Sequence, residues 1–505
     1  MNDLSTSASG KFLLFDDHHV SRKKGFDLRL GQAFSDSDPA LLPDRPWESG
    51  GIKGDSNCTV VDDNGLLRLW YAVADPRLAG GRKTREVPDS VLAALDEKTR
   101  RDLLNVDQAV LCHAVSRDGV HWEKPAAGVV EFEGSRENNM LLRGRMGGTV
   151  FVDPRDAPER RYKLIHGAGP ALPHRVAWSD QAREIFHGVY GSWSADGLRW
   201  TTHPRPIMAW YTDTTNVAYY DPRIGRYAAF VRINQNLGFR DNGTYPIRRG
   251  AEHYRAIGRS ESDDFFDFPQ PEKIAEPSPR QRRPRATGMD YYNTAAMIHP
   301  GARDAYLMLS SNFHHEQNVL QVHLATSRDG VRYRRWTEPL VGLGAAGRFD
   351  SGSVYMATGV VCRGSEMWLY YHGCDYHHGE KPTRPRCGGI GRVRMRLDGF
   401  ACQQARPGGG ELLTVPVDSG ERLAVNMDAG AGGRVKVELC DEAGAPVPGY
   451  TAAEADWLFY NDVDRTVTWR GQNRLPEPGR KVRLRFIGEG VKLYAFRFFQ
   501  EAVKQ

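Results

Sequence analysis

Four aspartates occupy matching places in a series of strand, turn and strand segments. Asp55, Asp213, Asp290 and Asp350 each stand at the head of the first strand of their segment. Carboxylates that converge on one axis repel each other, so at least one of them should have a raised pKa and keep its proton near neutral pH. A protonated carboxyl beside an ionised one is the pair that cleaves a glycosidic bond. Capping of strand-head amides, or support of a water column, is the alternative for any single aspartate.

The segments that carry these aspartates belong to a repeat. Each has two strands joined by a turn of hairpin-favouring residues, and a third strand then ends in a turn such as "SRDGVHW", "SADGLRW" or "SRDGVRY". The repeats begin at Gly54, Arg145, Tyr211, Gly288 and Arg348. Five such units predict an all-β fold with a five-bladed β-propeller over residues 1–400. The Asp-Gly turns are interpreted as structural staples, because this pair is ordinary in hairpins.

Two other parts of the chain depart from the repeat. The N-terminal stretches "KFLLFDDHHV" and "FDLRLGQAF" alternate apolar and polar residues and would suit a strand that closes the ring against the last blade. Residues 401–505 alternate without the turn repeat, which predicts a separate C-terminal β-sandwich. One helix is expected over residues 88–105, where apolar residues follow a helical period.

The repeat also predicts which loops lie at each end of the propeller channel. In a propeller, the heads of the first strands and the connections between second and third strands share one mouth of the central channel. We expect the channel to be lined there by ten substrate-binding residues in addition to the aspartates. They are Arg145, His174, Arg175, Arg232, Asn234, His314, His315, Asp375, His377 and His378.

This combination of repeated blades, axial aspartates and a C-terminal sandwich resembles the five-bladed propeller glycosidases, the superfamily of arabinanases, β-xylosidases, invertases and levansucrases. The resemblance covers nearly the whole chain at the level of architecture. It implies that Asp55 is the base or nucleophile and that Asp213 orients the reacting groups. The resemblance also implies a glutamate as the acid, but no glutamate heads a strand, so Glu316 is our choice of proton donor, with Asp290 and Asp350 behind it.

The expected function is therefore hydrolysis of a glycan or oligosaccharide, with no cofactor required. Arginines at the mouth favour an anionic sugar or a phosphate acceptor, so a glycoside phosphorylase stays open. A metal-dependent hydrolase or lyase is a second alternative, because "FHHEQ" and "DYHHGE" offer imidazole and carboxylate ligands for a divalent metal. A carbohydrate-binding propeller without activity is the third.

Composition limits the partners. The net charge of +5 comes from 68 basic and 63 acidic residues spread along the chain, which is not typical of nucleic-acid binding. No apolar run is long enough to span a membrane. Seven cysteines without a CxxC pair indicate free thiols, and the N-terminus has no secretory pattern, so we expect a cytoplasmic protein.

Overall fold

The computed structural model describes residues 10–54, 58–74, 109–143, 145–168, 188–210, 212, 214–234, 254–281, 288–378, 380 and 388–500. Within these ranges the protein is all-β, with two short 3-10 helices, η1 (Pro46–Glu48) and η4 (Pro158–Arg160). The helix expected over residues 88–105 lies outside them. In the described part of the chain, no helix has the length and apolar character needed to cross a membrane. The six cysteines described are free, as expected.

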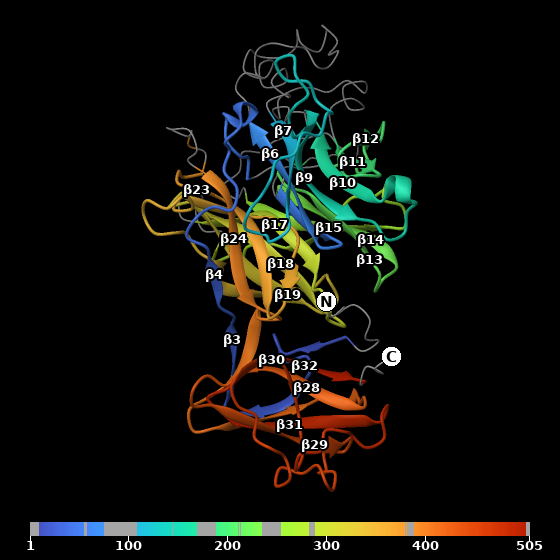
Figure 1. Cartoon of the computed structure of the whole chain (residues 1–505), viewed down its shortest axis with the longest axis vertical. Coiled ribbons are helices and arrows are strands. Elements are labelled where there is room, and N and C mark those ends of the chain that lie inside the picture. Colours follow the sequence, from blue (N-terminus) through green and yellow to red (C-terminus); the bar gives the residue numbers. More distant parts are fainter. Residues whose placement is uncertain are drawn as a thin grey trace.

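Five antiparallel units of four strands form the larger of two bodies, the upper one in Figure 1. The first unit is β5 (Cys58–Asp63), β6 (Leu66–Ala74), β7 (Ala109–Ser116) and β8 (Met140–Arg143). The second is β9 (Arg145–Val152), β10 (Tyr162–Ala168), β11 (Val189–Ser194) and β12 (Thr201–Thr202). The third is β13 (Val217–Asp221), β14 (Arg226–Asn234), β15 (Arg255–Ser262) and β16 (Glu272–Ala275).

The last two units are hydrogen-bonded into one larger sheet. The fourth is β17 (Met289–Ile298), β18 (Tyr306–His314), β19 (Val319–Ser327) and β20 (Arg334–Val341). The fifth is β21 (Ser353–Met356), β23 (Glu366–Cys374), β24 (Gly388–Arg396) and β4 (Ala33–Ser35), with β22 (Val361–Arg363) beside β23.

The inner strands of these units close a ring. Strand β5 contacts β9, β9 contacts β13, β13 contacts β17, β17 contacts β21, and β22 of the fifth unit returns to β5. An axial cavity of about 190 Å³ is lined by residues from all five units, among them Thr59, Thr149, Val217, Ala296 and Thr358. The β-propeller predicted from the repeat is therefore confirmed.

Strands inside the ring are apolar on both faces because a neighbouring unit covers each face. In β18, Leu307 and Leu309 pack toward the fifth unit, whereas Met308 between them packs toward the third. Successive residues of a strand point to opposite faces, so burial of both faces removes the usual polar alternation. This packing holds the head of each inner strand rigidly at the channel.

The Asp-Gly turns act as the structural staples that the sequence predicted. In the second unit, the Gly197 N–H donates to the Ser194 hydroxyl at 2.9 Å, and Asp196 accepts from two backbone N–H groups at 2.8 Å. The Gly197 carbonyl in turn accepts from the indole N–H of Trp70 in the first unit at 2.8 Å. The Ser and Asp contacts recur at Ser116 with Asp118 and at Ser327 with Asp329.

A second repeated contact clasps successive units together. The aspartate that ends an inner strand accepts from the hydroxyl of a tyrosine that begins the second strand of the next unit. The pairs are Tyr162 to Asp63, Tyr227 to Asp153 at 2.8 Å and Tyr306 to Asp221 at 2.7 Å. These aspartates lie at the opposite end of the inner strands from the predicted catalytic ones.

The smaller body is a sandwich of two sheets with a shared apolar core. One sheet has the order β3-β25-β32-β28-β30, with β1 beside β32, and the other has the order β2-β26-β31-β27, with β29 beside β31. Its C-terminal strands are β25 (Ala401–Ala405), β26 (Gly410–Thr414), β27 (Val417–Asp418), β28 (Arg422–Asp428), β29 (Arg434–Asp441), β30 (Asn461–Thr466), β31 (Lys481–Glu489) and β32 (Lys492–Phe499).

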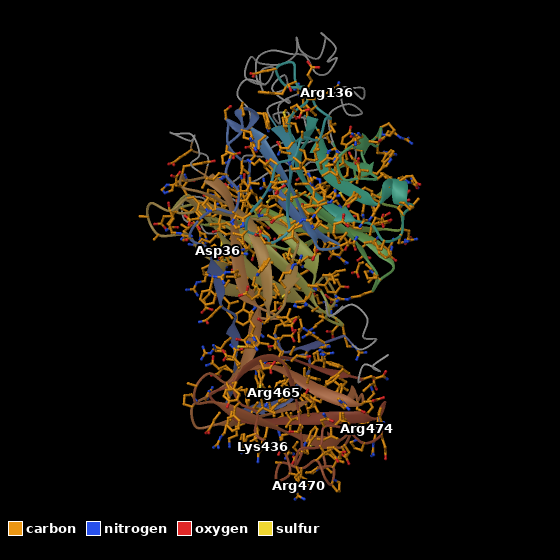
Figure 2. All side chains as sticks on the ribbon, viewed as in Figure 1. Asp36, Arg136, Lys436, Arg465, Arg470 and Arg474 are labelled. Carbon is orange, nitrogen blue, oxygen red and sulfur yellow. The ribbon has the colours of Figure 1, made fainter. Side chains whose placement is uncertain are left out.

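The N-terminal strands correct the expected division of the chain. Strands β1 (Phe12–Leu13), β2 (Val20–Lys24) and β3 (Phe26–Leu30) pair within the sandwich, so residues 12–30 do not belong to the propeller as the range 1–400 implied. Only β4 closes the ring, by pairing with β24. Asp36, which follows β4, accepts from Arg392 at 2.7 Å and from Arg394 at 2.9 Å (Figure 2). The N-terminal segment therefore joins the two bodies.

Candidate functional site

Contacts around the fourth unit identify the mouth of the channel where the inner strands begin. Asp290 is the second residue of β17, and His315 lies in the turn between β18 and β19. The His315 Nε2 atom is 3.1 Å from Oδ2 of Asp290. A first-strand head and a connection between second and third strands therefore share this mouth, as the repeat predicted.

Asp290 is a buried and ionised carboxylate, 1% exposed. Its Oδ2 atom also lies 2.7 Å from Nη1 of Arg255. Burial alone would raise its pKa, but the hydrogen bond from His315 and the charge of Arg255 outweigh burial and lower the pKa below the usual 3.8. Asp290 is therefore not the aspartate with the raised pKa that the sequence predicted for at least one of the four, and a lowered pKa does not fit the role of proton donor.

A β-bulge at Tyr292 shapes the head of β17, where the register with β18 shifts between Tyr291 and Asn293. Arg232 holds this bulge from the third unit. Both its Nε and Nη2 atoms donate to the Tyr292 carbonyl, with the Nε bond at 2.9 Å, and its guanidinium lies 4.3 Å from the Tyr292 ring centre. Arg232, expected to bind substrate, thus fixes the backbone two residues from Asp290.

An aromatic cluster adjoins these charged groups. The ring of His378 lies edge-on to those of Tyr292 and Phe313, at 4.6 Å from each centre, and its Nδ1 is 2.9 Å from the Tyr355 hydroxyl. The three partners are each less than 8% exposed. The sequence-predicted His378 therefore links the fourth and fifth units.

The other predicted residues of that loop are more open. His377 is exposed and lies 3.7 Å from Glu380, whereas Asp375 is half-buried.

Glu316, the predicted proton donor, is exposed in the turn between β18 and β19. His314 faces a different neighbour from His315, because its ring lies 5.9 Å from that of His323. Burial, with a contribution from His315, lowers the pKa of His314.

The carboxylate of Asp350 is held by side chains of its own unit. Its carboxylate accepts from the Tyr371 hydroxyl at 2.6 Å and from Arg348 at 3.1 Å, and it is 1% exposed. The chain also passes so closely that a Cβ on Gly344 would lie 1.9 Å from Oδ1 of Asp350. These contacts anchor the loop before β21.

Several predicted residues cannot be placed at the mouth from their side chains. Asp55, Asp213, His174 and Arg175 lie outside the described residues, and for Arg145 and Asn234 only the backbone is described, at the start of β9 and the end of β14. Gly54, however, is described beside the buried His372 of β23. A Cβ on Gly54 would lie 2.1 Å from Nδ1 of that ring. His372 is thus next to the residue that precedes Asp55.

Sequence reasoning missed Arg255. It begins β15, the third strand of its unit, and thus stands at the mouth for the same reason as the predicted loops. The available signal was its place in the repeat: Arg255 begins the strand that follows β14, the second strand of the unit, which carries Arg232.

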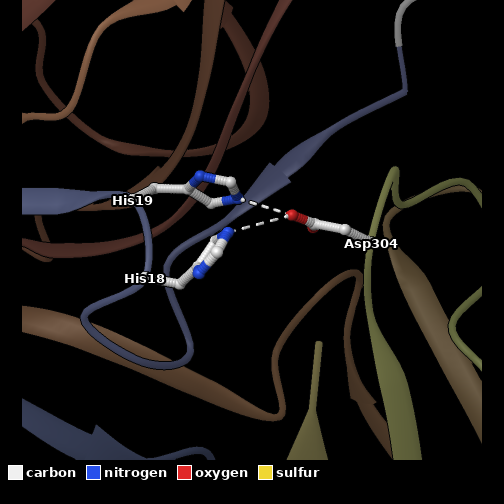
Figure 3. A group of neighbouring side chains, drawn as sticks. All are labelled: His18, His19 and Asp304. Carbon is white, nitrogen blue, oxygen red and sulfur yellow. Dashed lines mark ion pairs between the residues drawn. The ribbon is translucent and has the colours of Figure 1, made fainter. Parts of the chain in front are cut away.

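The described residues hold one cluster with the spacing of a metal site, and it is remote from the mouth. His18 and His19 lie 3.5 and 3.4 Å from Asp304, which follows the far end of β17 (Figure 3). Arg328 already places a guanidinium there, 2.5 Å from Asp304 and 3.2 Å from Nε2 of His19. A cation that close opposes a metal ion, so this cluster is an ion-pair contact between the N-terminal segment and the propeller.

The ring and the sandwich together define the class of the fold, an all-β chain with a β-propeller and a β-sandwich. No family model and no curated protein sequence matches the chain.

Solved structures of low identity are similar to the chain. One is a β-1,2-mannobiose phosphorylase from Listeria innocua with β-1,2-mannobiose, at 14% identity and a TM-score of 0.45, covering 73% of this chain and 98% of that one. Another is an N-acetylgalactosamine deacetylase from F. plautii with blood group B trisaccharide, at 14% identity and a TM-score of 0.43, covering 78% of this chain and 97% of that one. A third is the catalytic domain of a GH62 α-L-arabinofuranosidase from Coprinopsis cinerea, at 12% identity and a TM-score of 0.40, covering 72% of this chain and 97% of that one.

Proposed function

We propose that the protein is a carbohydrate-active enzyme that cleaves a glycosidic bond at the mouth where the inner strands begin. The observation that carries this proposal is the buried, ionised Asp290 at the head of β17, held by Arg255 and His315. A carboxylate kept charged in a buried place can stabilise positive charge that develops on a sugar ring. The Tyr292 ring of the aromatic cluster adjoins this pair, with the Arg255 guanidinium 5.2 Å from its centre.

The remaining roles follow from the repeat. Asp55 and Asp213 precede β5 and β13 in the sequence, and we assign them the roles of base or nucleophile and of orienting carboxylate. Asp290 then supplies fixed negative charge, and Asp350 belongs to the scaffold. Hydrolysis needs in addition a group that protonates the leaving oxygen.

The test is turnover of a panel of p-nitrophenyl glycosides and of unmodified oligosaccharides, each with and without inorganic phosphate and with and without EDTA. We expect release of a sugar that survives EDTA, and products that carry phosphate would assign phosphorolysis. Loss of activity in EDTA would support the metal-dependent alternative. Binding of oligosaccharides without any turnover would leave a carbohydrate-binding propeller and end the proposal.

A further inference from the structure

His315 is held in one orientation at the mouth. Its Nε2 atom lies 3.1 Å from Oδ2 of Asp290, and its ring meets that of Phe313 edge-on at 4.5 Å. Its backbone N–H donates to the Gly288 carbonyl at 3.0 Å. Both the ring and the backbone are therefore fixed, as a group that must meet a ligand in one geometry requires.

The two ring nitrogens of His315 have different surroundings. A carboxylate oxygen can only accept, so the Nε2 atom carries a proton that it donates to Asp290. Among the described residues, no group hydrogen-bonds Nδ1. The side chain of His315 is 15% exposed, against 2% for that of Asp290. Nδ1 is therefore the atom that can exchange a proton with a ligand in the mouth.

Arg255 favours the ionised form of the Asp290 carboxylate. Its Nη1 atom lies 2.7 Å from the same Oδ2 atom that accepts from His315. Positive charge at that distance favours the carboxylate over the carboxylic acid. The Oδ2 atom therefore accepts from both Arg255 and the Nε2 atom of His315, and Nδ1 is the ring nitrogen left for a ligand.

The adjacent Glu316 has no comparable support. It is exposed in the turn, and the described residues provide no hydrogen bond that fixes its carboxylate. Asp290 is ionised, and Asp350 is bound by Tyr371 and Arg348. In contrast, His315 has both a fixed orientation and a ring nitrogen, Nδ1, that no described residue hydrogen-bonds.

We propose that His315 is the catalytic proton donor to the leaving group, and that Asp290 and Arg255 are its positioning residues. This inference rests on the proposed function and moves the role of donor from Glu316 to His315. The imidazolium ring donates from Nε2 to Asp290 and from Nδ1 to the glycosidic oxygen.

The proton balance is that of ordinary acid catalysis. As the glycosidic C–O bond breaks, its electron pair stays on the oxygen, which takes the Nδ1 proton, and the ring becomes neutral. The attacking water gives one proton to the carboxylate base and its oxygen to the sugar. A proton from solvent then restores the imidazolium ring.

The first experiment compares leaving groups on the sugar that the wild-type enzyme turns over. A methyl glycoside needs protonation of its leaving oxygen, whereas a p-nitrophenyl glycoside needs little. His315→Gln should lower kcat/KM by about 100-fold or more on the methyl glycoside and by less than about 10-fold on the p-nitrophenyl glycoside. Glu316→Gln should affect both substrates equally and weakly.

A rescue experiment separates chemistry from structure. His315→Gly should regain turnover of the methyl glycoside when imidazole is added, because the free base can occupy the vacated place. Asp290→Asn should lower kcat more on the methyl glycoside than on the p-nitrophenyl glycoside, because the His315 ring loses the acceptor that orients it. His121→Gln is the matched control, because His121 is 86% exposed in the staple turn of the first unit.

The results distinguish this inference from the function on which it rests. Equal losses on both glycosides for His315→Gln, or the selective loss appearing in Glu316→Gln instead, would overturn the role of His315 while the glycosidase proposal stands. A wild-type enzyme without turnover of any glycoside would end both.

Discussion

The Nε2 atom of His299 lies 3.7 Å from Oδ1 of Asp398, at the place where the first three units pair an aspartate with a tyrosine. In sequence, "IHP" of the fourth unit stands where the second and third units have "VDP" and "YDP". Asp398 comes from the turn between β24 and β25, and its other oxygen binds Lys11 at 2.7 Å and Asn426 at 3.1 Å. The repeat is therefore broken where the sandwich joins the propeller.

The first prediction concerns pH. Burial lowers the pKa of His299 to about 4 from 6.5, despite the opposing charge of Asp398. Above pH 6.5 the residue is neutral in both the folded and the unfolded chain. As pH falls from 6.5 toward 4, the unfolded chain takes up a proton that the folded one resists, so stability is lost, by about 1.4 kcal/mol for each pKa unit.

The measurement is the Tm of the wild type and of His299→Gln across this range. The wild type should lose more Tm than the variant between pH 6.5 and 4. His323, whose pKa burial also lowers to about 4, is present in both proteins and cancels in the difference. Parallel curves would show that burial does not lower the pKa of His299 in the folded chain.

The second prediction tests the clasp between units. Tyr227→Phe removes the hydroxyl that donates to the buried Asp153, so the free energy of unfolding should fall by about 1–3 kcal/mol. Tyr220→Phe is the control on the same pair of strands, because Tyr220 is half-buried and the described residues give its hydroxyl no hydrogen bond. Denaturation midpoints measure both variants, and equal midpoints would contradict a stabilising clasp.

The sequence was sufficient for the propeller because its units are local, apart from β4 in the fifth unit. The other neighbouring strands in a unit follow each other along the chain, and the staple turns at Asp118, Asp196 and Asp329 repeat with them. The N-terminal strands could not be assigned in this way. Strand β1 pairs with β32 and β3 with β25, and a short alternating strand does not specify which distant sheet it joins.

In the described part of the site, the sequence predicted the position of His315 near the head of β17. It predicted a raised pKa for at least one of the aspartates from repulsion among carboxylates. Asp290 is not that one, because His315 and Arg255, the latter from a third strand of the neighbouring unit, lower its pKa. Which cation meets which carboxylate depends on side-chain packing between units, and spacing along the chain does not contain it.

The third prediction separates two buried aspartates that the sequence placed in one class. Asp290→Asn should lower kcat by about 100-fold or more, because charge at the mouth is lost. Asp350→Asn should mainly lower Tm, because it weakens the contacts with Tyr371 and Arg348. The assay is turnover per folded molecule beside thermal unfolding, and a fully folded Asp350→Asn enzyme without turnover would return that residue to the mechanism.

The fourth prediction concerns the two strand-head aspartates assigned from the repeat. Asp55→Asn and Asp213→Asn should each lower turnover by at least about 100-fold, with far-ultraviolet circular dichroism unchanged, as removal of a positioned acid or base does. Near wild-type kcat in both variants on the true substrate would rule out catalysis by these carboxylates.

The last prediction uses the close approach at Gly54. A Cβ there would lie 2.1 Å from Nδ1 of His372 and 2.8 Å from a ring carbon of Tyr355, and both of these rings are buried. Gly54→Ala should therefore displace the backbone that leads to Asp55, and kcat should fall in the same direction as in Asp55→Asn. Gly342→Ala is the control, since a Cβ at that exposed position meets no atom within 4 Å. Steady-state kinetics on both alanine variants measures the effect. If Gly54→Ala lost Tm but kept kcat per folded molecule, the strand head would be a packing site and Asp55 would not depend on it.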